Sequence, residues 1–167
     1  YPRVFKTEIV GNGPEVAARH FRNFSFVSGV ILNTRLAQGL TTSAVDGSEM
    51  YQMYIGCRMI AAGAALATIN QVTIRKDIQL AGEQVDSYAT IRHRSDGWRI
   101  TPRHLTLGKL GPLVIDAIEP YVQPHERQPL FENIYLQLYL FTYPFWLVEY
   151  RRVQSWPYAL GVCLGLH

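Results

Sequence analysis

The stretch SEMYQMYIGCRMIAAGAALA, residues 48–67, carries the clearest helical pattern in this 167-residue chain. Ser48 can cap a helix and Glu49 suits its positive end, and apolar residues then recur at intervals of three and four. These apolar residues are Met50, Met53, Tyr54, Cys57, Ile60, Ala61 and Ala64. Gly56 and the alanines after Ile60 allow another element to approach closely. We therefore expect a helix over residues 48–67 with a sheet packed on one side.

Three shorter elements are expected before this helix. Residues 3–10 favour a short strand, and Gly11-Asn12-Gly13 favours a turn because glycine tolerates positive φ. Pro14 suits the first turn of a helix, so the spacing of apolar residues predicts an amphipathic helix over 14–24. The run of β-branched residues over 26–36 predicts a strand that is buried on both faces.

Residues 72–80, 85–94 and 98–107 each predict a strand, because apolar and polar side chains alternate along them. Ser95-Asp96-Gly97 predicts a hairpin turn, and a change of parity at Pro102 indicates a β-bulge. Together with the helix over 48–67, these strands predict an α+β fold in which a curved, mostly antiparallel sheet packs on one main helix.

The composition excludes a disordered chain, since 48% of the residues are apolar and 17% charged. The length predicts one domain over 1–167, with an α+β core over 1–110 and an aromatic-rich extension over 111–167. A net charge of +3 is too small to imply a polyanion partner. Cys57 and Cys163 favour buried free thiols, although a single bridge between them stays open. Because the chain begins at Tyr1, we expect a processed or trimmed product, and no compartment is predicted.

Ten of the twenty aromatic residues lie within residues 131–158. Residues 134–148 are the most apolar part, but they are too short to span a bilayer. As a strand they would place tyrosines on one face and leucines on the other, and both faces would need burial. The extension either completes the core of its own chain or presents a Tyr- and Trp-rich interface to a protein partner. The candidate binding residues are Tyr135, Tyr139, Tyr143, Trp146, Tyr150 and Trp156.

A second candidate surface is the hairpin within residues 75–109, where basic side chains outnumber acidic ones. Arginine forms planar contacts that suit protein interfaces. Proteins that bind single-stranded nucleic acid interleave basic residues with aromatic ones, but the aromatic residues of this chain lie elsewhere. Nucleic acid is therefore not expected as a partner. The candidate binding residues of the hairpin are Arg92, Arg94, Arg99 and Arg103.

Several sequence features within residues 69–107 carry a family resemblance. They are Asn70, the Gly82 turn, Val85-Asp86-Ser87-Tyr88, Asp96-Gly97-Trp98-Arg99-Ile100 and Arg103. This region resembles the C-terminal sheet of the ketosteroid-isomerase-like (SnoaL-like) cone fold. The resemblance implies a cone-shaped pocket that takes a small apolar ligand, and acid–base catalysis without a metal or organic cofactor. The acid–base candidates are Asp86, Tyr88, His93, His104 and Asp116, with Tyr51 and Tyr54 as hydrogen-bond donors.

The chain also departs from that family, which usually opens with a long helix, and Leu66 stands where many members have a histidine. No metal, phosphate or nucleophile motif accompanies the candidates. Our leading interpretation is therefore an interaction or assembly subunit that binds other protein chains, or a second copy of itself. It would use the aromatic segment and the arginine-bearing hairpin. The alternative is a small-molecule isomerase, dehydratase or cyclase of the cone type.

Overall fold

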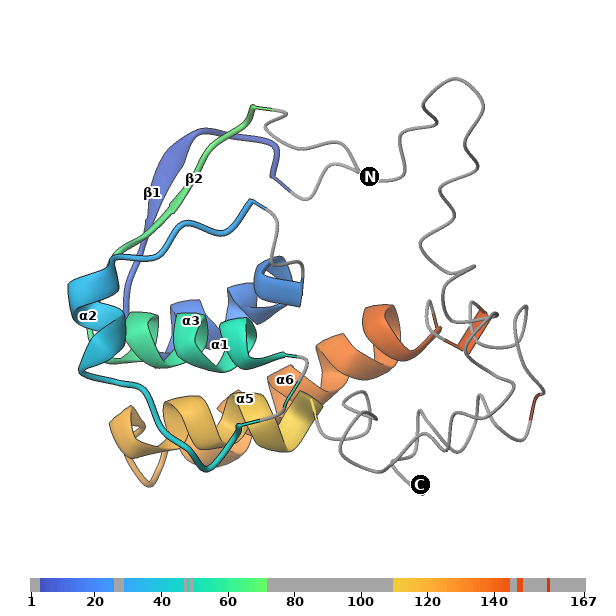
Figure 1. Ribbon diagram of the computed structural model, residues 1–167. Helices are drawn as coiled ribbons and strands as arrows, with labels where there is room; N and C mark the ends of the chain where they lie inside the picture. The colour runs from blue at the N-terminus through green and yellow to red at the C-terminus, as the bar shows by residue number, and fades with distance from the viewer. Residues whose placement is uncertain are drawn as a thin grey trace, which may run out of the picture.

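The computed structural model describes residues 4–25, 29–46, 48, 50–71, 110–144, 147–148 and 156. These residues form helices and a small antiparallel sheet, so the described part is α+β. Figure 1 shows three levels: a ribbon of two strands, then helices α1 and α3, and then helices α5 and α6. The three strands expected within residues 72–107 lie outside the described residues, and the curved sheet that they would form stays a prediction.

The ribbon consists of β1 (Glu8–Gly11) and β2 (Leu66–Thr68), which pair antiparallel. β1 overlaps the predicted strand over 3–10 in its last three residues and ends one residue later, at Gly11. The turn that follows is as predicted, since Gly11 and Gly13 have φ values of 128° and 93°. The Gly13 amide donates to the Ile60 carbonyl oxygen at 2.8 Å. This bond fixes the turn against the C-terminal end of α3.

Helix α1 (Pro14–His20) continues into the 3₁₀ helix η1 (Phe21–Ser25), and together they cover the predicted helix over 14–24. Proline occupies the first turn of α1, where a missing amide hydrogen costs nothing. Phe21 and Phe24 are buried and form part of the core. The helix predicted over 14–24 is therefore confirmed, with a 3₁₀ helix as its last part.

Helix α3 (Tyr51–Ala61) is the centre of the core, and eight of its residues are buried. It is shorter than the predicted helix over 48–67, because it begins after Met50 and ends before Gly63, whose φ is 106°. The Ser48 hydroxyl still accepts a hydrogen bond, from the Met50 amide at 3.2 Å. In the described part of the chain, helices α1 and α5 pack against α3, where a sheet was expected.

The strand predicted over 26–36 is wrong for the residues that the structure describes there. Residues 29–33 lie in no regular element, and α2 (Thr34–Gln38) is a short helix with no buried residue. Asn33 explains the helix, because its side-chain oxygen accepts from the amides of Arg35 and Leu36. This local cap favours a helical turn after Asn33, although the apolar residues of the segment favoured a strand there.

The C-terminal part of the described chain is helical. Helix α5 (Leu110–Ile118) leads through the 3₁₀ helix η3 (Glu119–Tyr121) to α6 (Arg127–Gln137), which continues as the π-helix η4 (Leu138–Thr142). The residues that the structure describes within 134–148 are helical, so the interpretation of this segment as a strand is wrong for them. None of the helices in the described ranges is long and apolar enough to cross a membrane.

Candidate functional site

Helix α6 is attached to the core by one side. Ile134 and Leu138 are fully buried, and Leu130 packs against the same core one turn earlier. The Gln137 amide nitrogen donates to the Ala18 carbonyl oxygen of α1 at 2.8 Å, and to the Asn133 side-chain oxygen at 2.9 Å. The position and rotation of α6 are therefore fixed by apolar contacts and by a polar bond between helices.

The other side of the same helix is apolar and exposed. Leu136, Tyr139, Leu140 and Phe141 are 56%, 59%, 58% and 53% exposed. Three of these residues are consecutive and lie in the π-helix, whose wide turn occurs often at functional sites. Apolar side chains on a helix are normally buried, but these four stay more than half exposed among the described residues.

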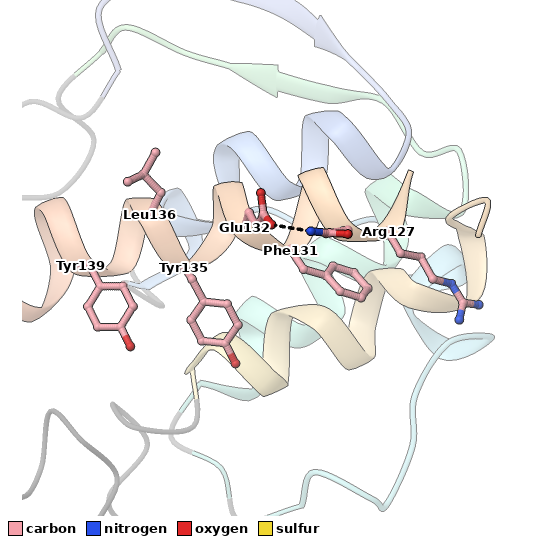
Figure 2. Close-up of a pocket in the computed structure, with 7 residues that line it drawn as sticks. Arg127, Phe131, Glu132, Tyr135, Leu136 and Tyr139 are labelled. Carbon is pink, nitrogen blue, oxygen red and sulfur yellow. Dashed lines mark hydrogen bonds between the residues drawn. The ribbon is translucent and has the colours of Figure 1, made fainter. Parts of the chain in front are cut away.

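A groove of about 590 Å³ runs along this exposed side. It is open to solvent, and Figure 2 shows side chains of α6 and η4 that line it. The described lining residues are Arg127, Gln128, Phe131, Glu132, Tyr135, Leu136 and Tyr139. We define the α6 face as Phe131, Tyr135, Leu136, Tyr139 and Leu140. One helix therefore supplies an aromatic groove together with the apolar side chains beside it.

The tyrosine rings of the α6 face are held in place by their neighbours. The Tyr135 and Tyr139 ring centroids are 6.4 Å apart and the ring planes differ by 28°. Tyr139 also meets the edge of the buried Tyr143 ring, at 5.3 Å and 80°. Tyr135 lies over Gly111 of α5, where a β-carbon would be 2.6 Å from the ring. Both tyrosines are therefore ordered before any ligand binds.

The charged groups at the groove are partly engaged with each other. Arg127 forms an ion pair with Glu119 of η3 at 3.1 Å. The Gln128 side-chain amide donates to one carboxylate oxygen of Glu132 at 2.9 Å. Within the described residues Glu132 has no basic partner. The groove therefore has one acidic group whose charge is not balanced locally.

On the other flank of the helix, Arg22 of η1 contacts Phe141. The Arg22 guanidinium carbon lies 4.7 Å from the centre of the Phe141 ring, which is a cation–π arrangement. Phe141 is thus apolar and exposed, but its ring already has a charged neighbour. For this reason we do not include Phe141 in the α6 face.

Six candidate binding residues of the aromatic segment were expected from the sequence, and the structure describes four of them. It brings Tyr135, Tyr139 and Tyr143 into one row, although Tyr143 is buried and supports Tyr139 from behind. Trp156 is half-exposed. Trp146 and Tyr150, and the hairpin residues Arg92, Arg94, Arg99 and Arg103, lie outside the described residues.

Four candidates of the cone-fold interpretation lie outside the described residues, namely Asp86, Tyr88, His93 and His104. The structure describes the other three, which are Asp116, Tyr51 and Tyr54. Asp116 is exposed on α5, far in sequence from the two tyrosines of α3. The Tyr51 hydroxyl donates to the Thr42 carbonyl oxygen at 3.3 Å, and the Tyr54 hydroxyl accepts a hydrogen bond from Arg58. Tyr51 therefore joins α3 to the loop before it, whereas the Tyr54 hydrogen bond lies within α3.

Sequence reasoning missed five of the groove residues, namely Arg127, Gln128, Phe131, Glu132 and Leu136. The signal for two of them was present, because Arg127, Phe131, Tyr135 and Tyr139 recur at every fourth position. In a helix, that spacing places all four residues on one side.

We also searched the described residues for metal ligands and for a reactive thiol. No group of three metal-ligating side chains occurs in the described ranges. Cys57 is fully buried in α3, and burial raises the pKa of its thiol, so it is not a nucleophile in the folded chain.

No protein-family model matches the sequence, and neither a curated protein nor a solved structure matches it with significance.

Proposed function

We propose that this chain is an interaction subunit that binds another protein chain through the α6 face. The observation that carries the proposal is the exposed apolar half of α6, on a helix whose other half is fixed in the core. Tyrosine, phenylalanine and leucine on a preordered surface are typical of the centre of a protein interface. The arginine-bearing hairpin would add a second contact, and that part of the proposal rests on the sequence.

The preordered geometry supports binding over a purely solvated surface. A side chain that is already fixed loses less conformational entropy when a partner covers it. Tyr135 and Tyr139 meet this condition through Gly111 and Tyr143. The α6 face thus combines apolar area with low ordering cost, which is the combination found in interface hot spots.

Site-specific photocrosslinking tests the proposal. A photoreactive phenylalanine analogue replaces Tyr139, and a matched chain carries it at Leu36, which is 49% exposed on α2. In cells that produce the chain, we expect a discrete protein adduct from position 139 and none from position 36. The adduct should be lost when Leu136→Glu is added. A folded chain that gives no protein adduct from position 139 contradicts the proposal.

A further inference from the structure

The area of the α6 face limits the kind of partner. An aromatic or leucine side chain carries roughly 200 Å² of surface, so the half-exposed Leu136, Tyr139 and Leu140 of the α6 face present about 350 Å². A stable interface between two folded chains needs about 800 Å² from each partner. The area is therefore too small for a stable dimer of folded chains, and it suits a short segment of a partner.

The hydrogen-bonding groups of the groove indicate the conformation of that segment. Figure 2 shows the Tyr135 and Tyr139 rings side by side with their hydroxyl groups pointing the same way. Within the described residues neither hydroxyl has a hydrogen-bond partner, so both are free to donate. A helical ligand uses its carbonyl groups internally and would leave these donors unused. A polyproline II segment has no internal hydrogen bonds, and its carbonyl groups are free to accept.

The tyrosine pair offers a continuous aromatic surface on which such a segment can lie. The Tyr135 and Tyr139 centroids are 6.4 Å apart, and their planes are inclined by only 28°. Proline has no amide hydrogen, so a proline-rich segment can lie on this aromatic surface without burying an unpaired donor.

The charge at the groove indicates a flanking residue of the ligand. Glu132 lines the groove and accepts only from the neutral Gln128 amide among the described residues. Arg127 is already paired with Glu119. A lysine or arginine beside the prolines would form an ion pair with Glu132.

We propose that the groove on α6 binds a proline-rich segment of a partner chain in the polyproline II conformation, with a basic residue beside the prolines. This inference rests on the proposed function and adds the chemistry of the partner. The aromatic rings receive the prolines, the two phenol hydroxyls donate to backbone carbonyls, and Glu132 selects the basic residue.

Fluorescence anisotropy with the full chain tests this proposal. The probe is a fluorescein-labelled decaproline peptide that carries one terminal arginine, and we expect saturable binding. Tyr139→Ala should raise the Kd about tenfold, as expected for the loss of a central aromatic contact. Tyr139 is exposed, so the variant should fold, and circular dichroism checks this. Leu36→Ala, on the exposed α2, is the matched control and should leave the Kd unchanged.

The charge is tested separately with Glu132→Gln. This variant should weaken binding of the arginine-bearing peptide and leave binding of an uncharged decaproline unchanged. Equal effects on both peptides would contradict the assigned role of Glu132.

Three results would overturn the polyproline assignment. They are the absence of saturable binding, an unchanged Kd in Tyr139→Ala, and tighter binding of an amphipathic helical peptide. The assignment would also be wrong if the chain sediments as a dimer and Leu136→Glu dissociates that dimer. The groove would then bind a second copy of the chain instead of a proline-rich segment. In each case, a photocrosslinked protein adduct from position 139 would still support the proposed function. If that adduct is also absent, both proposals are contradicted.

Discussion

Replacing Gly56 by alanine should destabilise the helical core, although the same change inside a helix normally stabilises it. Helix propensity favours alanine by about 1 kcal/mol. A β-carbon at Gly56 would lie 2.6 Å from two carbons of the Phe24 ring and 3.0 Å from its Cγ. Phe24 is only 6% exposed, so its ring cannot turn away into solvent. Such overpacking costs about 1–3 kcal/mol, and we expect a net loss of about 1 kcal/mol.

Urea denaturation followed by circular dichroism measures this change in the free energy of unfolding. The control is the Phe24→Leu background, in which the smaller side chain leaves room for the new methyl group. There Gly56→Ala should stabilise the chain by up to about 1 kcal/mol, because only the propensity effect remains. A stabilising effect of Gly56→Ala in the natural background would show that the Phe24 ring does not lie against Gly56, and the packing of η1 on α3 would be wrong.

Three further predictions concern other parts of the chain. Gly111→Ala should leave the free energy of unfolding nearly unchanged but weaken binding at the α6 face, because the new methyl group would push the outer end of the Tyr135 ring out of its ordered position; denaturation and anisotropy measure the two effects. Burial lowers the pKa of His20, so stability should fall as the pH drops below about 7 through the unfolded-state value near 6.5, and His20→Gln should flatten this part of the curve. In a Cys163→Ser background, Cys57 should react with a thiol reagent only at the rate of unfolding, since it is fully buried.

The N-terminal half of the described fold could be predicted because its signals are local. Glycine at Gly11 and Gly13 supports positive φ, and Pro14 fits only the start of a helix. The intervals of three and four along α3 correspond to the residues that the structure buries. What packs on α3 was not predictable from these signals, because small residues such as Gly56 admit an aromatic ring from a helix as readily as a sheet.

Residues 134–148, which include the end of α6 and all of η4, could be interpreted as a strand because two periods coincide in their sequence. Tyr135, Tyr139 and Tyr143 are separated by four residues, and four is both two strand repeats and about one helical turn. The decisive residue is Gln137, which a strand would place among the tyrosines. In the structure it points to the core and donates to the Ala18 carbonyl oxygen. Such a long-range bond has no local signal, so the period could not be settled from the sequence.

The energetics of the α6 face favour a reversible partner over a permanent one. Covering about 350 Å² of apolar surface at roughly 25 cal/mol per Å² would stabilise a complex by about 9 kcal/mol before the costs of association. Association itself costs about 4–15 kcal/mol, and ordering a flexible segment adds to this. Little net affinity would remain for a ligand that must first fold. A proline-rich segment already holds its bound conformation in solution, so it loses less entropy on binding than a helix that forms on the surface. The small area and the free phenol donors of Tyr135 and Tyr139 therefore favour the same class of ligand.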